Sequence, residues 1–435
     1  MEQERNKVYL AALLHDIGKF YQRADNKKSN GDFFYLKKDF WNDPSPYCPE
    51  YRSFYSRKHV LWTAQFIDEN KSVFSFLNSE AFKGNNSLTR LAALHHKPET
   101  DLQKIIQIAD HYSSAVDRNN DRFSLEDGLE DNNWDNFKKK RMVSVFEGLQ
   151  KENQNGISSD YTYIFPVEKL VLNELAFFPK KIDDFNGKIP EYDRLWNGFI
   201  EEFQKIPAKN FFVFSESLLT LFEKYTVTIP SSTQHLPDVS LFDHAKTTAA
   251  FAVAIYDFYI ENNRLPSEED FPVRLIGADI SGIQKFIYDI VSKNAAKNLK
   301  GRSFYLQLLI DSTLRHTLRR LNLFQANVVY SSGGGFYLLA SNTKKSKEML
   351  AQIEHEISNK LFEIHKTTLF AAMDSVAISH KALLPVKYNI DIKTEGISNV
   401  WKELTGKLNI KKRIRYAEKM IDDYPDFVPD RHKKD

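Results

Sequence analysis

Apolar residues recur at two different spacings along this chain, and the change of spacing divides it. From Tyr9 to Phe20 they lie three or four positions apart, which predicts a buried or half-buried helix. Similar helical patterns continue to about residue 118, with an aromatic, proline-containing loop over residues 29–55 between them. The first quarter of the chain is therefore predicted to be helical.

The region from residue 271 to 379 alternates between strand and helix patterns. Its predicted elements are a strand over 271–279, a helix over 302–321, two strands within 327–340, a helix over 344–366 and a strand over 369–379. The order β-α-β-β-α-β is that of a ferredoxin-like fold, which is also the palm of many polymerases and nucleotide cyclases. The predicted fold class is α+β, with an all-helical N-terminal domain followed by this domain and its helical insertions.

The remaining segments suit linkers and shorter elements. Residues 119–136 are polar and acidic, as in a linker, and one helix is predicted over 138–151. Strand composition is found over 161–166, and helical patterns over 191–203, 217–225 and 243–262. The predicted divisions are a helical domain (1–118), a linker with a helix (119–160), a helical and strand region packing on the later domain (161–270), the βαββαβ domain (271–400) and a basic C-terminal segment (401–435).

Two polar residues, His15 and Asp16, interrupt the first apolar run. Burying a bare carboxylate is costly, so Asp16 needs a partner. A core histidine with an ion-paired aspartate is one explanation. A metal ion is the other, because imidazole and carboxylate are common ligands of divalent cations. Adjacent residues diverge by about 100° on a helix, so both side chains converge only on an ion in a cleft beside it.

Further histidines and an aspartate lie near the ends of the other predicted helices. His59 begins one helix, His95 and His96 end another before Pro98, and Asp110 ends a third. This recurrence favours the metal site over the ion-paired core. His244, at the start of the helix over 243–262, is predicted instead to cap or pack that helix.

The motifs Leu-Leu-His-Asp-Ile-Gly-Lys-Phe (13–20), Leu-His-His-Lys-Pro (94–98) and Ile-Ala-Asp (108–110) resemble the HD nuclease domain of the large subunit of type III CRISPR effector complexes, with subtype III-A fitting best. The resemblance implies cleavage of single-stranded DNA with a divalent transition metal such as Mn²⁺, Ni²⁺ or Co²⁺. The implied catalytic residues are His15, Asp16 and Lys19, and the implied metal ligands are His15, Asp16, His59, His95, His96 and Asp110. Lys19 would steady phosphate charge or be a solvated lysine, and His111 matches no ligand.

Three later motifs are similar to the first palm domain of the same family. They are Asp-Ile-Ser-Gly-Ile-Gln-Lys-Phe-Ile (279–287), Leu-Lys-Gly-Arg-Ser-Phe-Tyr-Leu-Gln-Leu-Leu (299–309) and Ser-Ser-Gly-Gly-Gly-Phe (331–336). A palm that transfers phosphoryl groups shares carboxylates between two metal ions about 3.5–4 Å apart. Asp279 follows the first strand, but the hairpin carries glycines where acids are needed. This palm is therefore expected not to catalyse alone.

The family resemblance implies a second palm, bearing Gly-Gly-Asp-Asp, which makes cyclic oligoadenylate from ATP with Mg²⁺. No such motif precedes Asp435, so we expect a shortened form or one half of a split protein. The glycines form either a nucleotide site or a plain tight turn. The candidate nucleotide-binding residues are Asp279, Ser281, Gly282, Lys300, Arg302, Ser332, Gly333, Gly334 and Gly335.

Composition limits the remaining possibilities. The chain has 435 residues, 42% hydrophobic and 27% charged, as in an ordinary soluble protein. Its single cysteine, Cys48, excludes a disulfide framework and a four-cysteine zinc site. No apolar run reaches the roughly 18 residues that span a bilayer, and the N-terminus is too charged for a signal peptide. A cytoplasmic protein without membrane association is expected.

A net charge of +2 gives no global attraction to nucleic acid, so binding depends on local basic patches. The expected partners are single-stranded DNA, other type III CRISPR subunits with guide RNA, a second palm domain, and another copy of the chain. An apolar surface including Tyr330, Phe336 and Tyr337 is expected to meet the second palm or that copy.

Two alternative functions stay open at this point. Many HD proteins are nucleotide phosphohydrolases, although the palm motifs argue for a polynucleotide substrate. The chain would otherwise be a non-catalytic assembly module of the effector complex.

Overall fold

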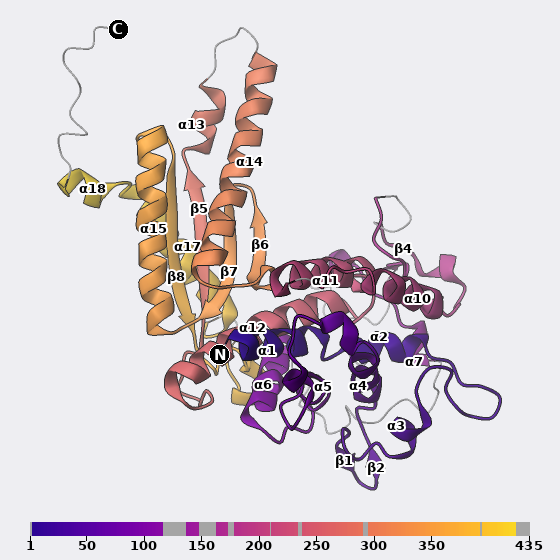
Figure 1. Ribbon diagram of the computed structural model, residues 1–435. Helices are drawn as coiled ribbons and strands as arrows, with labels where there is room; N and C mark the ends of the chain where they lie inside the picture. Colours follow the sequence, from indigo (N-terminus) through magenta and orange to yellow (C-terminus); the bar gives the residue numbers. More distant parts are fainter. Residues whose placement is uncertain are drawn as a thin grey trace, which may run out of the picture. The chain divides into compact units, whose positions relative to one another are not determined.

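The protein is described from a computed structural model (Figure 1), which covers residues 2–115, 136–147, 162–172, 178–208, 210–233, 237–289, 295–391 and 394–422. The chain forms two compact units. Unit 1 contains residues 1–265 and 383–390, and unit 2 contains residues 266–382 and 391–435. The segment 161–270, expected to pack on the later domain, belongs almost entirely to unit 1.

Unit 1 is mainly helical in its described part. Its helices are α1 (Glu2–Leu14), α2 (Ile17–Ala24), α3 (Lys38–Asn42), α4 (His59–Glu69), α5 (Leu88–Ala93), α6 (Asp101–Ala115), α7 (Asn136–Lys139), α10 (Tyr192–Phe203), α11 (Phe211–Thr226), α12 (Leu241–Asn262) and α16 (Pro385–Tyr388). Two short strand pairs, β1 (Glu50–Tyr51) with β2 (Phe54–Tyr55) and β3 (Tyr163–Ile164) with β4 (Lys180–Lys181), lie between helices.

The core of unit 1 forms around α1 and α12. Helix α1 packs against α5, α6 and α12, so its residues from Val8 to Leu14 are all buried. Alanines along α12, including Ala245, Ala249 and Ala252, are fully buried and let these helices approach closely. Aromatic side chains of α2, α4 and α10, among them Phe20, form a second cluster that fixes α2 beside α4.

Two predictions for unit 1 need correction. The first apolar run is not one helix, because α1 ends at Leu14 and α2 begins at Ile17. His15 and Asp16 lie in the turn between them. The single helix predicted over 138–151 is interrupted in its described part: α7 ends at Lys139, Val143 forms a β-bridge with Ile164, and residues 145–147 are helical again. The predicted linker, residues 119–136, lies outside the described residues except for its last residue.

Unit 2 has the predicted β-α-β-β-α-β order. Its elements are β5 (Val273–Ser281), α13 (Ile283–Tyr288), α14 (Ala295–Arg320), β6 (Val328–Ser332), β7 (Gly335–Ser341), α15 (Lys344–His365), β8 (Phe370–Ile378), α17 (Ile397–Arg413) and α18 (Ala417–Asp422). The strands form one antiparallel sheet in the order β6-β7-β5-β8. The predicted α+β class is confirmed.

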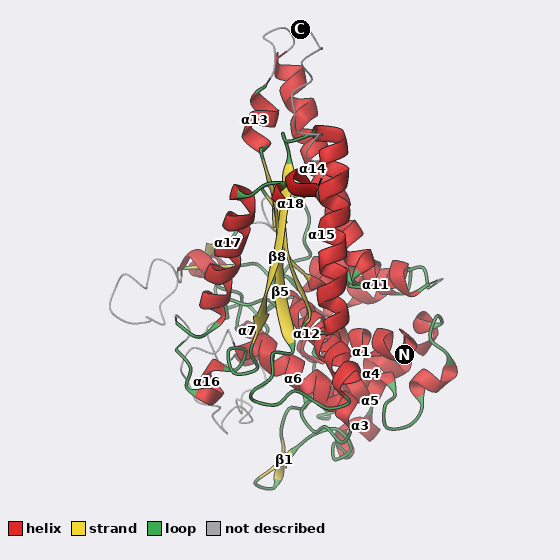
Figure 2. Ribbon diagram, turned by 90° about the vertical axis from the view of Figure 1, so that its left-hand side faces the viewer, coloured by secondary structure: helices red, strands yellow, loops and turns green. Residues whose placement is uncertain are grey.

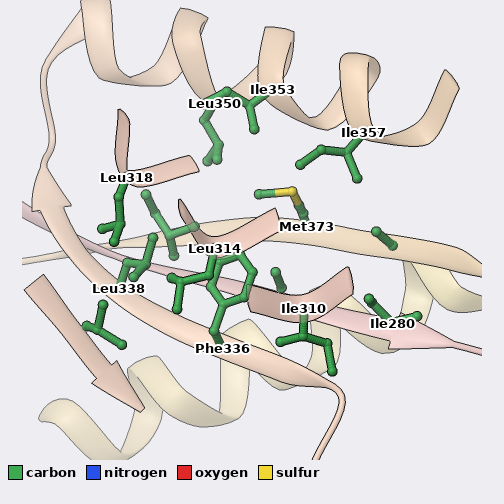
Figure 3. Close-up of a cluster of buried hydrophobic side chains, with 14 of the residues drawn as sticks. Ile280, Ile310, Leu314, Leu318, Phe336, Leu338, Leu350, Ile353, Ile357 and Met373 are labelled. Atoms are coloured by element: carbon green, nitrogen blue, oxygen red, sulfur yellow. The ribbon is translucent and has the colours of Figure 1, made fainter. Parts of the chain in front are cut away.

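Helices cover both faces of this sheet. On one face, α14 and α15 bury a cluster that includes Ile276, Leu314, Phe336 and Ile353 (Figure 3). On the other face, α17 packs against β5 and β8, opposite α15 (Figure 2). Gly277 makes this close packing possible, since a Cβ there would lie 3.0 Å from Leu408. The predicted basic C-terminal segment (401–435) therefore contributes to this domain through α17.

The expected apolar surface on the hairpin is only partly present. Phe336 is 2% exposed and points into the cluster of Figure 3, so it is a core residue and is not free to meet a partner. Tyr330 is exposed and Tyr337 is half-buried. Within the described residues, no helix is both long and apolar enough to cross a membrane.

Candidate metal centre

Seven polar side chains gather beside the turn between α1 and α2. His15 and Asp16 come from the turn itself, and each of α4, α5, α6 and α12 or its flanking residues supplies others. The seven are His15, Asp16, His59, His95, His96, Asp110 and His244. Three overlapping groups have ligand atoms within 4.8 Å of one another: His59, His95 and His96; His15, Asp110 and His244; His15, Asp16 and His95.

The distances within this centre fit a shared cation. His244 Nε2 lies 3.1 Å from Asp110 Oδ1 and 3.3 Å from Asp16 Oδ2, while His59 Nε2 lies 3.1 Å from Asp16 Oδ1. Two ligand atoms that are each about 2.1 Å from one ion lie about 3.0–3.4 Å apart in tetrahedral or octahedral geometry. The side chains are therefore as close as ligands of one ion.

Gly18 sets the distance between α2 and α4. A Cβ at Gly18 would lie 2.0 Å from the backbone oxygen of His59, so glycine is required for this approach. Thr63 ties the elements together, because its hydroxyl accepts from Gly18 N at 3.1 Å and donates to the His15 carbonyl at 2.9 Å. The Gly in the His-Asp-Ile-Gly motif thus brings His59 to Asp16.

Two of the histidines are oriented by backbone carbonyls. His15 Nδ1 donates to Ala12 O and His95 Nδ1 donates to Ala92 O, each at 2.7 Å. Each ring therefore turns Nε2 toward the centre, as metal-ligating histidines usually do. The buried atoms Asp16 Oδ1, His59 Nε2, His95 Nε2 and His96 Nε2 make no hydrogen bond of good geometry among the described residues, although His59 Nε2 and Asp16 Oδ1 lie 3.1 Å apart. Such unsatisfied atoms are expensive unless an ion uses them, so this donor set fits a metal.

The charges within the centre point the same way. Burial lowers the pKa of His59 to about 4 and that of His95 to about 3, so both imidazoles are neutral near pH 7. Burial also lowers the pKa of His15, but Asp16 and Asp110 outweigh it and raise this pKa to about 10. Without an ion, a proton on His15 and the ammonium group of Lys19 together balance the two carboxylates; a divalent cation can take over the role of the proton.

The carboxylates stay ionised despite their burial. Burial would raise the pKa of Asp16, but Lys19 and His15 hold this pKa well below its usual range. Lys19 Nζ lies 2.7 Å from Asp16 Oδ2 and donates to the Ser231 carbonyl at 3.0 Å. Lys19 is therefore a fixed positive charge at the centre. Its side chain is only 25% exposed, so it is not the solvated surface lysine that the sequence left open.

His244 is the residue that the sequence interpretation missed. It was expected to cap or pack α12, but its Nε2 lies 3.2 Å from His15 Nε2 and its Nδ1 is 3.1 Å from Ser113 Oγ. The capping side chain of α12 is Ser240, which accepts from Asp243 N. The sequence did contain a signal for this residue. Asp243 and His244, at the start of an alanine-rich helix, are an adjacent aspartate and histidine, the same two residue types as His15 and Asp16.

The candidate nucleotide-binding residues of unit 2 gather mostly at one end of the sheet. Asp279 on β5 faces Gly335 on β7, and Ile280 N donates to Gly334 O at 2.8 Å. Ser281 Oγ donates to Phe370 O, and Gly282 begins α13. Ser332 and Gly333 are exposed beside them. The turn needs glycine, because Gly333 and Gly334 have φ of +65° and +106°.

The basic candidates behave differently from each other. The Arg302 guanidinium donates to Phe286 O and lies 5.1 Å from the centre of the Phe286 ring, so it packs on α13. Lys300 is exposed and has no described contact with the glycine turn. Asp279 is occupied: Lys412 Nζ of α17 lies 2.7 Å from its Oδ2. A lysine of the same unit thus neutralises this carboxylate.

Comparison with protein families assigns both parts of the chain. The HD domain model matches residues 1–115, and the model for Csm1 subunit domain B matches residues 272–426. A Cas10/Csm1 protein of Methanocaldococcus jannaschii, described as a CRISPR single-strand-specific deoxyribonuclease of subtype III-A, is 28% identical over 452 residues, covering 96% of this chain and 51% of its own length. A Streptococcus thermophilus protein of the same description is 27% identical, covering 96% and 50%.

Solved structures agree in fold. A Csm1–Csm4 cassette in complex with AMPPNP matches with a TM-score of 0.66 and 22% identity, over 95% of this chain and 49% of that one. Csm1 of T. onnurineus matches with a TM-score of 0.65, also at 22% identity and over the same shares. The chain thus matches an HD-domain model in its first part and the model for Csm1 subunit domain B in its later part. Along 96% of its length it is similar to Cas10/Csm1 proteins of subtype III-A CRISPR systems, and it spans about half the length of these relatives.

Proposed function

We propose that unit 1 is a metal-dependent nuclease that cuts single-stranded DNA as part of a type III-A CRISPR effector. The observation that carries the proposal is the set of buried Nε2 and carboxylate oxygen atoms that have no hydrogen-bond partner and converge at the α1–α2 turn. Relatives of the chain are described as single-strand-specific deoxyribonucleases, which supports the substrate.

Each group has a defined task in this proposal. His15, Asp16, His59, His95, His96, Asp110 and His244 would hold a divalent transition metal such as Mn²⁺, Ni²⁺ or Co²⁺. A bound ion would lower the pKa of a water molecule and polarise the scissile phosphate. Ala12 and Ala92 carbonyls keep His15 and His95 in one tautomer, and Lys19 offers positive charge to the phosphate at the edge of the centre.

The test is a cleavage assay with Mn²⁺ on single-stranded DNA, dNTPs and cyclic nucleotides, using wild type and the His15→Ala/Asp16→Ala double variant. We expect cleavage of DNA alone and at least a hundredfold loss in the double variant, with the melting temperature of the metal-free protein nearly unchanged. His316→Ala, which changes a half-buried histidine of unit 2 paired with Glu356, is the control and should cut normally. A double variant that cuts at the wild-type rate removes the nuclease assignment. Cleavage of dNTPs or cyclic nucleotides instead of DNA would support a nucleotide phosphohydrolase. The absence of any cleavage would support a non-catalytic assembly module.

For unit 2 we propose a nucleotide-binding palm that is catalytically incomplete. Its support is the β-α-β-β-α-β order, the glycine turn with Gly333 exposed, and the neutralisation of Asp279 by Lys412. ATP with Mg²⁺ would bind at this turn only together with a second palm, alongside other type III subunits and guide RNA in the cytoplasm. Mass spectrometry of this chain incubated with ATP should therefore detect no oligoadenylate, and any such product contradicts the proposal.

A further inference from the structure

Arg23 is a buried arginine on the same face of α2 as the metal centre. Positions 16, 19 and 23 are separated by three and four residues, so their side chains share one side of the helix. Arg23 is 4% exposed, and none of the described carboxylates forms an ion pair with it. Its two terminal nitrogens donate to Lys19 O at 3.3 Å and to Pro230 O at 3.1 Å. Asp16 acts on this charge electrostatically but forms no ion pair with it.

Two further groups extend this feature. Arg141 is 9% exposed, donates to Lys188 O at 3.3 Å, and also forms no ion pair with a described carboxylate. Tyr192 is 1% exposed and is within electrostatic range of both arginines. Arg23 Nε and the Tyr192 hydroxyl have no hydrogen-bond partner among the described residues. The region next to the metal centre thus combines buried positive charge with unused donors.

A comparison with other arginines of unit 1 shows that this is not the general pattern. Arg5 is also buried but is paired through two hydrogen bonds with Asp257, at 2.7 and 2.9 Å. Arg90 likewise has an Nε without a partner, yet its guanidinium is paired with Glu99. A buried guanidinium without a carboxylate is costly, and a protein that keeps one usually supplies an anion from elsewhere.

We propose that Arg23, together with Lys19 and Arg141, binds the phosphodiester backbone of the strand whose scissile phosphate lies at the metal centre. The inference rests on the proposed nuclease function and adds residues that hold the substrate. Guanidinium groups match phosphate oxygens in geometry and charge. Seven residues of helix separate Asp16 from Arg23, or about 10 Å, so Arg23 reaches a phosphate one to three nucleotides from the cut.

The present partners of Arg23 and Lys19 are consistent with this role. Both cations are held by carbonyl oxygens of one short segment, Pro230 O for Arg23 and Ser231 O for Lys19. Phosphate oxygens would take over these hydrogen bonds and supply the missing negative charge. A buried water between Arg23 Nε and the Tyr192 hydroxyl would satisfy the donors but leave the charge unbalanced. The alternative is therefore a purely structural arginine with an ordered water.

The experiment measures binding without cleavage, so it does not depend on the metal. Fluorescence anisotropy of a labelled 15-residue oligothymidylate is recorded in EDTA over about 50–300 mM NaCl. Each phosphate contact to a single strand contributes about 0.7 to the slope of log K against log salt. We expect Arg23→Gln to bind five- to tenfold more weakly at low salt with a slope smaller by about 0.7, and Arg23→Lys to retain most of both. Arg90→Gln is the matched control and should change neither.

Thermal melting separates the two interpretations. Removing an unpaired buried charge should leave the melting temperature of Arg23→Gln unchanged or raise it, whereas a structural arginine would lower it. A lower melting temperature with unchanged affinity and slope overturns the proposal, and so does a wild type without salt-dependent binding. If Arg23→Gln does not fold, the same binding experiment is done with Arg141→Gln. A slope of log K against log salt that is smaller by about 0.7 supports the proposal, and an unchanged slope overturns it. Retained cleavage in the His15→Ala/Asp16→Ala variant would reject only the proposed nuclease site. The proposal for Arg23 would stand or fall separately, because the anisotropy experiment measures DNA binding without cleavage.

Discussion

Asp16 of unit 1 and Asp279 of unit 2 are both carboxylates at the end of an apolar element, but their surroundings differ. Asp16 is buried among histidines, and its Oδ1 makes no hydrogen bond. Asp279 is 37% exposed in its side chain and forms an ion pair with Lys412. The centre in unit 1 contains potential ligand atoms without hydrogen bonds, whereas in unit 2 the Asp279 carboxylate is neutralised by Lys412 of the same unit. The presence of an aspartate therefore says less about metal binding than the groups that already neutralise its carboxylate.

The first way to sharpen this contrast is to disrupt unit 2 and ask whether the metal centre persists. Phe336→Glu places a charge in the apolar cluster between the sheet and α14–α15 and should cost about 3 kcal/mol or more. Circular dichroism and limited proteolysis should show loss of unit 2 structure. Mn²⁺ binding, measured by calorimetry, should remain because the ligands all belong to unit 1. Tyr330→Glu, at the exposed hairpin position, is the control and should be tolerated. A stable Phe336→Glu protein would contradict the core assignment.

Gly18→Ala tests the geometry of the metal centre. The new methyl group would overlap the backbone oxygen of His59, so α4 must move away, at a cost of about 1–3 kcal/mol and at least a tenfold loss of Mn²⁺ affinity. Gly301→Ala is the matched control within helix α14, where a Cβ meets no atom within 4 Å. That change should stabilise the protein slightly, because alanine has the higher helix propensity. Equal effects at both positions would show that the α2–α4 contact does not position His59.

His244→Ala tests the ligand that comes from α12. Losing one donor of the centre should weaken Mn²⁺ binding about ten- to a hundredfold, as calorimetry of the two proteins would measure. Ser113→Ala should have a smaller effect, since Ser113 only orients the His244 ring. Unchanged metal affinity in His244→Ala would show that His244 is not a ligand and only packs or caps α12, as expected from the sequence.

The smallest effect is expected for Lys412→Met. The ion pair with Asp279 is partly exposed, so its loss should cost less than about 1 kcal/mol in urea unfolding. Asp279 alone should still bind no metal. The measurement is Mn²⁺ binding in a His15→Ala/Asp16→Ala background. A new stoichiometric site there would show that Lys412 masks a working palm carboxylate, and the contrast between the two units would disappear.

The regular elements were largely predictable because their patterns are local. The strand over 271–279, the helix over 344–366 and the two strands around the glycine turn correspond closely to β5, α15, β6 and β7. The errors have physical causes. The first apolar run looked like one helix because a two-residue break at His15 and Asp16 does not interrupt the apolar spacing. The helix over 138–151 is broken after Lys139 because Val143 pairs with Ile164, a residue 21 positions away whose approach no local pattern reveals.

The candidate sites were predictable to the extent that their residues lie in short motifs. The structure brings together the side chains of all six residues that the family resemblance implied as ligands. His244 could not be placed, because its separation of 229 residues from His15 is bridged only by tertiary packing. The pairing of Lys412 with Asp279 spans 133 residues and was hidden for the same reason.

The long separation between His15 and His244 also affects how the protein is made. At about 5–20 residues per second, roughly 10–45 s of synthesis separate the appearance of the two histidines. During that interval the nascent chain contains the His-Asp turn without the ring that α12 contributes. Contacts between residues so distant in sequence form late and slow folding. The seven side chains can therefore come together only after α12 has been synthesised, and an ion bound by them would be enclosed only once these helices have packed.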